Sequence, residues 1–476
     1  MDHAIILLPE FLIALLGLFI LTFGRRLPRM VAPIATYGLV AALGVLFGQF
    51  MTGALGGTAF AQAIQMGPFA WLARGVILLG AAAASAIAWG ESSRRPDLQF
   101  GLLLLSAVGA LAMAGAADSL ILVLGAFILA LSVMGMIALG RGPNRAEATL
   151  KLFLFQGVTG AVLLFGLTWL FGLGGATSFV GLGGALQTPD TLLTYGMLLV
   201  LGGLAFMVAA IPFHAWLPDV TEGGSASTGA WLLGGAALAA VSGLVRVLMM
   251  VFPTNTALWA PYVTGLAVLS LLIGGLLALA QSDLRRLLGF SAVAISGFVL
   301  TALVSASHAA SGQEGLAALW MTALTGGVGI VGLVAGIGAV KAATLEDLNG
   351  LHRRAPGVAI AMTACALAVA ALPLSGTFWA RLTLLRGLLV YVSNSLQFGM
   401  IALAVLAMGV TVLLAYTALR IPKAIYLSRT SDASPSAIEA PAGHVAVLML
   451  CALLSVVFFL APAPLWGLVS FATIGF

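Results

Sequence analysis

Long apolar runs separated by short polar stretches repeat along the whole chain. Each run is about 20 residues long, the length that an α-helix needs to cross the hydrocarbon core of a bilayer. The first run lacks a basic region before it and a cleavage site after it, so we expect a retained span and not a signal peptide. The pattern predicts an all-α, polytopic membrane protein with fourteen spans, at 4–23, 30–50, 69–90, 99–117, 119–139, 151–172, 191–213, 226–250, 258–280, 286–306, 315–340, 357–383, 396–418 and 443–463.

Basic residues fall in every second loop between these spans. Cytoplasmic loops of membrane proteins are enriched in Lys and Arg. The loops 51–67, 173–190, 251–257 and 305–314 contain none. We therefore expect both termini on the non-cytoplasmic side and the long polar loop 420–443 in the cytoplasm. The basic residues that indicate the cytoplasmic side are Arg25, Arg26, Arg29, Arg94, Arg95, Arg141, Arg145, Lys151, Arg285, Arg286, Lys341, Arg353, Arg354, Arg420, Lys423 and Arg429.

Composition narrows the function classes. Of the 476 residues 62% are hydrophobic and only 7% are charged, and the net charge of +5 is scattered without a basic stripe, which argues against nucleic acid as a partner. Cys365 and Cys451 lie in apolar runs without a metal-ligand or disulfide spacing. No phosphate-binding glycine motif or haem or iron–sulfur spacing occurs. We therefore expect no cofactor, no metal and no catalytic residue in this chain.

Four polar stretches interrupt the apolar background. They are IPFHAWLPDV (211–220), NRAEATLKLFLFQG (144–157), ALAQSDLRRLLGFSAVAISG (278–297) and ALPLSGTFWARLTLLRG (371–387). A broken membrane helix frees backbone groups that can face an ion or water path. A simple proline kink is the alternative. The helix breaks predicted in the first and last stretches are at Pro212, Pro218, Pro373 and Gly376.

Charged residues in these stretches are candidates for an ion path. Glu147 and Lys151 stand four residues apart, in the order that favours an ion pair on a helix. We expect Asp219 and Glu222 near the N-terminus of the span 226–250, where negative charge is favourable. Arg285 lies at the cytoplasmic start of the span 286–306. Simple anchoring of charged helix ends at the membrane surface is the alternative for these residues.

These stretches, in this order, resemble those of one family. IILLPEFLIALLG (5–17), GLHRRAPGVAIAMTACALAVAALPLSGTFW (350–379) and APAPLWGL (461–468) extend the resemblance over nearly the whole chain. The sequence resembles the antiporter-like membrane subunits of respiratory complex I, of the subunit N type in NADH:quinone oxidoreductase, which are proton-conducting membrane transporters. Related subunits occur in membrane hydrogenases and in multisubunit cation/proton antiporters, so the parent assembly stays open.

The resemblance implies two five-helix repeats of inverted topology. They comprise the fourth to eighth and the ninth to thirteenth spans, with discontinuous seventh and twelfth spans. The predicted breaks fall in those two spans, which agrees with this arrangement. We therefore expect four segments: N-terminal helices (1–98), a first repeat (99–250), a second repeat (258–418), and a cytoplasmic loop with a C-terminal helix (419–476).

The resemblance also implies a proton route along the middle of the membrane, carried by a Glu, three Lys and a His. Protons cross hydrocarbon only through titratable groups or ordered water. Each buried charge costs about 2.5–3.5 kcal/mol on insertion scales, so apolar replacements ease insertion. We therefore expect a degenerate proton channel, since the corresponding positions here hold Phe127, Met207, Ala237, Ile295 and Ala380.

Arg381 and His214 are the remaining candidates for a proton path. Arg381 lies next to the last relay position, but a guanidinium keeps its proton at physiological pH and is a poor relay. His214 is the best titratable candidate, with a hydrogen-bonded structural role as the alternative. We expect Glu10, Arg74 and Arg246 to snorkel towards the non-cytoplasmic surface.

Three functions remain open from the sequence. The first is a membrane-arm subunit N of a proton-translocating NADH:quinone oxidoreductase whose own channel is degenerate. The second is an ion-translocating subunit, in that complex or a related assembly, that uses a rerouted path through Arg381, His214 and water. The third is a stand-alone secondary transporter, opposed by the lack of a central ionisable site.

The resemblance implies partners and a location as well. We expect homologous antiporter-like subunits and a small multi-helix subunit beside this chain, with lipid on the remaining faces. Flavin and iron–sulfur clusters are expected in partner subunits. The expected location is a bacterial-type inner (cytoplasmic) membrane.

Overall fold

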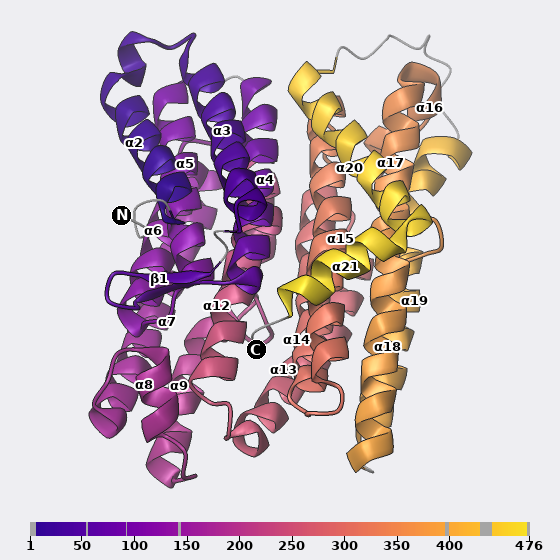
Figure 1. Ribbon diagram of the computed structural model, residues 1–476. Helices are drawn as coiled ribbons and strands as arrows, with labels where there is room; N and C mark the ends of the chain where they lie inside the picture. The colour runs from indigo at the N-terminus through magenta and orange to yellow at the C-terminus, as the bar shows by residue number, and fades with distance from the viewer. Residues whose placement is uncertain are drawn as a thin grey trace.

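The fold is almost entirely helical (Figure 1). This computed structural model describes residues 6–53, 56–91, 93–140, 144–395, 399–428 and 440–473. A small antiparallel sheet pairs β1 (Gly57–Ala59) with β2 (Ile64–Met66). Short turns are η1 (Gly24–Arg26), η3 (Glu346–Leu348) and the π-helical η2 (Leu232–Ala236). The α-helices are α2 (Leu8–Phe23), α3 (Val31–Met51), α4 (Pro68–Trp89), α5 (Pro96–Gly115), α6 (Ser119–Ala138), α7 (Arg145–Gly174), α8 (Phe179–Ala185), α9 (Thr191–Met207), α10 (Trp216–Gly223), α11 (Ala226–Trp231), α12 (Ala237–Met250), α13 (Thr256–Ala280), α14 (Leu284–Ala306), α15 (Gly312–Val340), α16 (Leu351–Arg354), α17 (Pro356–Val369), α18 (Gly376–Ser395), α19 (Gly399–Leu427), α20 (Ala442–Leu460) and α21 (Pro462–Ala472).

Twelve helical stretches among the described residues are long and apolar enough to cross a membrane. They coincide with twelve of the fourteen predicted spans, and the all-α membrane fold is confirmed. The other two predicted spans, 191–213 and 357–383, contain the shorter apolar helices α9 and α17. A non-helical segment follows each of them, so these are the two interrupted helices. The inverted relation between the two repeats stays a prediction.

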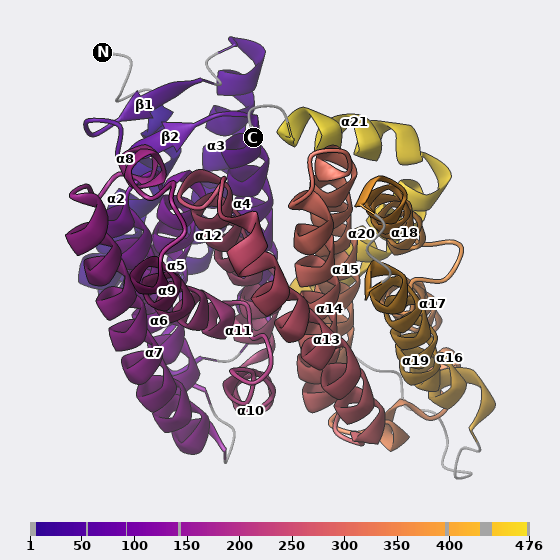
Figure 2. The ribbon, with the colours of Figure 1, turned by 90° about the horizontal axis from the view of Figure 1, so that it is seen from below.

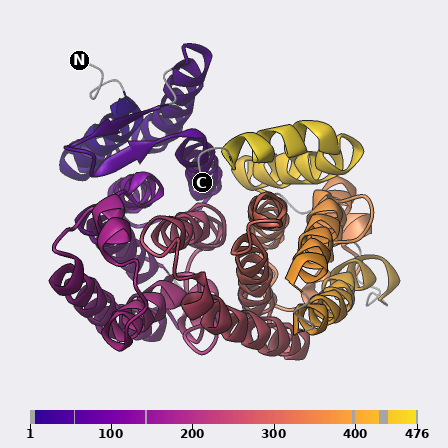
Figure 3. The same ribbon diagram turned by 60° about the horizontal axis from the view of Figure 1, so that its bottom comes forward.

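Central helices carry small residues where they meet, and outer helices carry large apolar ones. Within the most apolar 18-residue window of each helix, 94% of the residues of α14 are buried, whereas 28% of those of α7 are buried. A Cβ added at Gly274 of α13 would lie 2.8 Å from the backbone of Ala294, so only glycine allows α13 and α14 to approach this closely. The outer face of α7 exposes Phe153 and Val158. Figure 3 shows the central helices enclosed by the others.

Three charged residues expected to snorkel to the surface are held inside the protein, which corrects that prediction. Arg74 is 2% exposed and pairs with Glu10. Arg246 is 3% exposed and donates from Nε to the Ala116 carbonyl at 2.6 Å and from Nη2 to the Gln65 carbonyl at 2.9 Å. Snorkelling fails here because a carboxylate, a carbonyl at the end of α5 and a strand carbonyl offer these side chains partners inside the bundle.

The C-terminal part differs from the predicted spans. Helix α18 continues to Ser395 and α19 to Leu427, beyond the predicted ends at 383 and 418. The chain adds α21, which packs against α4 and α15 and lies near the N-terminal helices (Figure 2). The Phe471 ring of α21 lies 5.8 Å from that of Phe50 and 6.3 Å from that of Trp71, between centroids. Arg141, Arg429 and residues 430–439 of the predicted cytoplasmic loop 420–443 lie outside the described residues.

Candidate functional site

Both interrupted helices end in the same backbone motif. At the end of α9, Ala209 has a left-handed φ of 53° and the Ala210 N–H donates to the Ala205 carbonyl at 2.9 Å. At the end of α17, Ala371 has a φ of 53° and the Leu372 N–H donates to the carbonyl five residues earlier at 3.2 Å. This is the bonding pattern of a Schellman cap. A left-handed alanine costs about 1–2 kcal/mol, so the surrounding contacts must stabilise both breaks.

The first break is tied to its neighbours by hydrogen bonds. The Ile211 N–H donates to the Ser270 hydroxyl of α13 at 2.9 Å, and the Trp216 indole donates to the Phe206 carbonyl at 3.2 Å. These contacts satisfy groups that the break leaves without a helical partner. Pro212 lies in the non-helical segment, as predicted.

Pro218 does not break a helix, which corrects the prediction. It lies in the first turn of α10, where the missing proline N–H costs no hydrogen bond. In the second interruption Pro373 lies in the non-helical segment and Gly376 begins α18. The breaks therefore occupy residues 208–215 and 370–375.

An ion-pair cluster holds α10 against α7 and α14. Asp219 contacts Lys151 at 2.7 Å and Arg286 at 3.0 Å. Glu222 contacts Arg286 at 2.8 Å, and Glu147 contacts Lys151 at 2.7 Å as the spacing predicted. We call these five residues the α10 charge cluster. It brings together four of the predicted path candidates and fixes the second half of the interrupted helix.

Asp219 and Glu222 are not at the start of α11, contrary to the prediction. That helix is capped by Ser225, whose hydroxyl accepts the Thr228 N–H at 3.3 Å, and by Glu91, which accepts the Ser227 N–H at 3.0 Å. The separation of Glu91 and Ser227 by 136 positions left no signal in the sequence. A serine before an apolar run is a general N-cap signal and could have indicated Ser225.

Arg285 lies beside the charge cluster but forms no ion pair in the described part of the chain. It donates to the Gly224 carbonyl at 2.9 Å, at the end of α10. His214 lies in the first break, with its ring centroid 6.3 Å from that of Phe290, and takes part in none of the ion pairs among the described residues. The structure therefore does not join His214 to the cluster.

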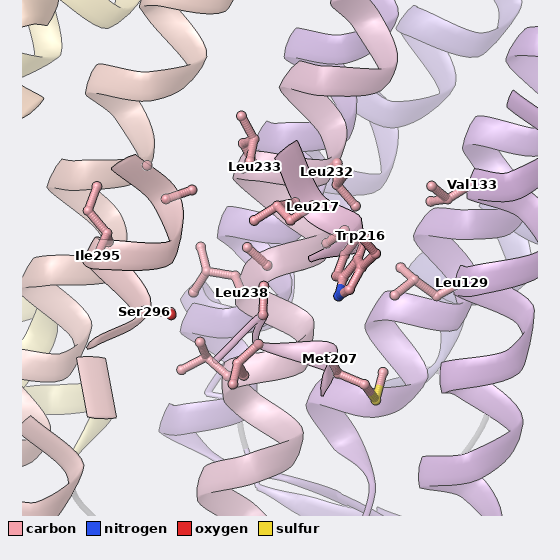
Figure 4. Close-up of a pocket in the computed structure, with 18 of the residues that line it drawn as sticks. Leu129, Val133, Met207, Trp216, Leu217, Leu232, Leu233, Leu238, Ile295 and Ser296 are labelled. Atoms are coloured by element: carbon pink, nitrogen blue, oxygen red, sulfur yellow. The ribbon is translucent and has the colours of Figure 1, made fainter. Parts of the chain in front are cut away.

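An apolar cavity of about 100 Å³ lies beside the first break (Figure 4). Met207, Ala237 and Ile295, three of the five positions that we expect to replace the family's relay, line it. Figure 4 shows Ile295 on one side and Leu129 on the other. No lysine, arginine, histidine, aspartate or glutamate is among the described residues of its wall.

The other two replaced positions lie outside this cavity wall. A Cβ at Gly160 of α7 would lie 2.9 Å from the Phe127 ring, so that ring fills the space between α6 and α7. Ala380 is fully buried in α18. Three of the five positions therefore border one cavity, and the other two are packed elsewhere.

Arg381 is a buried cation with few polar contacts. It is 3% exposed, its guanidinium carbon lies 3.3 Å from the centre of the Phe298 ring, and Nη1 donates to the Thr322 hydroxyl at 3.5 Å. Its Nε has no hydrogen-bond partner, and no carboxylate of the described residues lies within ion-pair distance. This geometry holds a fixed charge in place, with no titratable side chain of the described residues in hydrogen-bond contact to take its proton.

No group of three or more His, Cys, Asp or Glu side chains that could hold a metal ion occurs among the described residues. Cys365 and Cys451 are both free and buried. They face Gly332 of α15, where an added Cβ would meet the Cys365 sulfur at 2.3 Å and the Cys451 Cβ at 2.8 Å. That the chain binds no cofactor stays a prediction.

Solved structures show that this fold is shared. Respiratory complex I from Thermus thermophilus with bound aureothin contains a chain that aligns with a TM-score of 0.81 and 23% identity, over 97% of this chain and 99% of that one. The Mrp complex from Dietzia contains a chain with a TM-score of 0.87 and 20% identity, over 99% of this chain and 97% of that one. Identities this low establish similarity of fold.

Sequence relatives and a family model give the identity of the family. A protein of Thiobacillus denitrificans named NADH-quinone oxidoreductase subunit N is 32% identical over 308 residues, which are 63% of this chain and 62% of that protein. One of the same name from Polaromonas naphthalenivorans is 31% identical over 345 residues, 70% of this chain and 68% of that protein. The first alignment thus spans less than two thirds of the relative. Residues 116–414 match the model of the NADH:quinone oxidoreductase/Mrp antiporter membrane family, and the chain belongs to this family.

Proposed function

We propose that this chain is the N-type membrane subunit of a proton-translocating NADH:quinone oxidoreductase, or of a close relative of that complex. The family membership of residues 116–414 and the relatives named subunit N support this proposal. The redox chemistry would belong to partner subunits that carry flavin and iron–sulfur clusters. This chain would contribute no catalytic residue.

We further propose that the chain conducts no protons along its own mid-membrane axis. The apolar cavity beside the first break carries this proposal, because Met207, Ala237 and Ile295 line it and no ionisable side chain is among its described wall residues. An apolar cavity does not hold ordered water unless two to four polar partners bind that water. Gln156, Ser296 and Trp216 are the polar side chains among its described wall residues, and the last two already donate to backbone carbonyls. With no titratable group and few free polar partners for water, the cavity offers protons no continuous route.

A rerouted ion path is the second candidate function. The buried charge of Arg381 favours it, since a cation without a carboxylate partner creates a strong local field. His214 would be the titratable group of such a path. Arginine holds its proton too firmly to pass it on, so this path would need water between the two residues.

The proposed assembly also implies which subunits surround this chain and how the chain is oriented in the membrane. Homologous antiporter-like subunits and a small multi-helix subunit would cover part of the outer faces, with lipid on the rest. Both termini would face away from the cytoplasm in a bacterial-type inner membrane. The segments 1–98, 99–250, 258–418 and 419–476 would correspond to N-terminal helices, two inverted repeats, and a loop with a C-terminal helix.

Two measurements test the proposed function. Purification of the chain from its native membrane in mild detergent should yield flavin and iron–sulfur subunits with it. A solitary, monodisperse chain would contradict the assembly. The proton-to-electron stoichiometry of the reconstituted complex should remain unchanged when Met207→Leu and Ala237→Leu fill the cavity. A lower stoichiometry with the complex intact would show that this cavity conducts protons.

A further inference from the structure

Three cavities follow one another between α11–α12, α14 and α15. The outermost, which we call the vestibule, has a volume of about 660 Å³. A middle cavity of about 10 Å³ shares Ser225, Ala226 and Arg285 with the vestibule and Leu233 with the apolar cavity of about 100 Å³. The shared residues place the three cavities in one line, from one end of the bundle to the first break.

The positions of the wall residues along α14 and α15 give the same spatial order of the three cavities. On α14, Arg285 lies in the vestibule and middle cavity, Leu288 in the middle cavity, and Ala292 in the apolar cavity. The antiparallel helix α15 has the reverse order, with Gly338 in the vestibule, then Val334, then Ile330. The cavities are therefore successive sections of one axial space between the same helices.

The vestibule has several charged and polar side chains in its wall and reaches the protein surface. Its wall includes exposed residues such as Lys341 and Ala343. Glu91, Glu222, Asp283, Arg285 and His444 also line it. A cavity of this size and polarity offers the two to four partners that each ordered water needs.

The middle cavity changes from polar to apolar over a short distance. Its described wall contains Thr221, Ser225 and Arg285 towards the vestibule, and its apolar side chains include Leu233 and Leu288. The Thr221 hydroxyl already donates to the Pro218 carbonyl at 2.9 Å, and Arg285 donates to the Gly224 carbonyl at 2.9 Å. Its volume of about 10 Å³ is at the lower limit for a single water.

We infer that Leu233 and Leu288 form the barrier that closes the inner end of the vestibule. Water and small ions from the surface reach Arg285 and stop there, and the apolar cavity beyond the leucines is reached only when both side chains are shortened. The barrier concerns water access, and it stands whether or not the chain carries protons in its assembly. Leu233 and Leu288 thus separate the hydrated vestibule from the apolar cavity, a role that the proposed function does not assign to them.

Thiol labelling of reconstituted vesicles tests the barrier. In the full chain with Cys365→Ala and Cys451→Ala, a reporter cysteine is introduced by Ala343→Cys in the vestibule or by Ala237→Cys in the apolar cavity. A small membrane-impermeant cationic thiosulfonate is then added on each side. We expect position 343 to react at least 100-fold faster than position 237. With both leucines intact, equal reaction rates at the two positions would overturn the inference.

Shortening both leucines provides the second arm. With Leu233→Ala and Leu288→Ala present, labelling at position 237 should rise at least tenfold from the vestibule side. The matched control is Leu244→Ala with Leu303→Ala, two buried leucines of α12 and α14 that are not among the described wall residues of the three cavities. No rise at position 237, with unchanged reactivity at position 343, would place the barrier elsewhere. If the double variant fails to fold, the comparison of the two reporters in the first arm decides.

Discussion

Replacing Arg381 by methionine should leave proton translocation unchanged and slightly stabilise the chain. The guanidinium carbon lies 3.3 Å from the centre of the Phe298 ring, and a desolvated cation–π contact contributes about 2 kcal/mol. A central arginine costs about 2.5–3.5 kcal/mol on membrane-insertion scales. The long bond to Thr322, at 3.5 Å, adds little. Arg381→Met keeps most of the apolar stem, so the balance predicts a gain of about 1 kcal/mol.

The assay combines the thermal midpoint of the purified assembly with its proton-to-electron stoichiometry in vesicles. Arg386→Met on the same helix is the matched control, because Arg386 is 67% exposed and contacts Glu314 only at 3.6 Å. It should change neither quantity. A fall in stoichiometry for Arg381→Met, with subunit composition intact, would refute our reasoning and show a rerouted path. A marked loss of stability would show that a partner carboxylate neutralises the arginine in the assembly.

Three further predictions concern the charge cluster, a loop and topology. Asp219→Asn removes the ion pairs with Lys151 and Arg286, whose side chains are 39% and 34% exposed. Because solvent screens these charges, the loss of stability should be about 1 kcal/mol, measured as a lower thermal midpoint. The N–H groups of residues 344 and 343 donate to Asp347 and hold the pKa of its carboxyl below the usual range. The stability that this carboxylate contributes is therefore present above the unfolded pKa of about 4 and is lost as the pH falls through the folded pKa. Asp347→Asn should lose less stability on acidification than the wild type. Val180→Cys should react with impermeant reagents only from the non-cytoplasmic side, and cytoplasmic labelling would break the predicted order of spans.

The membrane spans could be predicted because each depends on a local property, an apolar run of sufficient length. Both interrupted helices were also visible, since Pro212 and Pro373 mark them within the sequence. The hairpin β1–β2 and helix α21 were not predicted. Both make contacts with distant residues: Arg246 donates to the Gln65 carbonyl of β2, and Phe471 of α21 contacts Phe50 and Trp71. Local apolar length carries no information about such contacts.

Some features of the candidate site could likewise be predicted from the sequence, and others depend on the tertiary fold. The Glu147–Lys151 pair follows from helical spacing and was predicted. The contacts of Asp219 with Lys151 and Arg286 join positions 68 and 67 residues apart, so they require the tertiary fold. The resemblance to the family predicted which positions replace the relay, and the structure shows that Met207, Ala237 and Ile295 border one cavity. The barrier that we infer at Leu233 and Leu288 rests on the cavities of the structure and had no signal in the sequence.

Both breaks are present although the positions that we expect to replace the family's relay are apolar, and packing explains why. Each break is held by the backbone bonds of its cap, at Ala209 and at Ala371, and the first break also by the bond from the Ile211 N–H to the Ser270 hydroxyl. Losing these bonds would leave buried donors and acceptors without partners, at a cost of about 1–3 kcal/mol each. The side chains of Met207 and Ala237 face a cavity, so their chemistry can change without loss of backbone contacts. The interrupted helices are therefore retained as part of the fold even where the ionisable groups that would use them are absent.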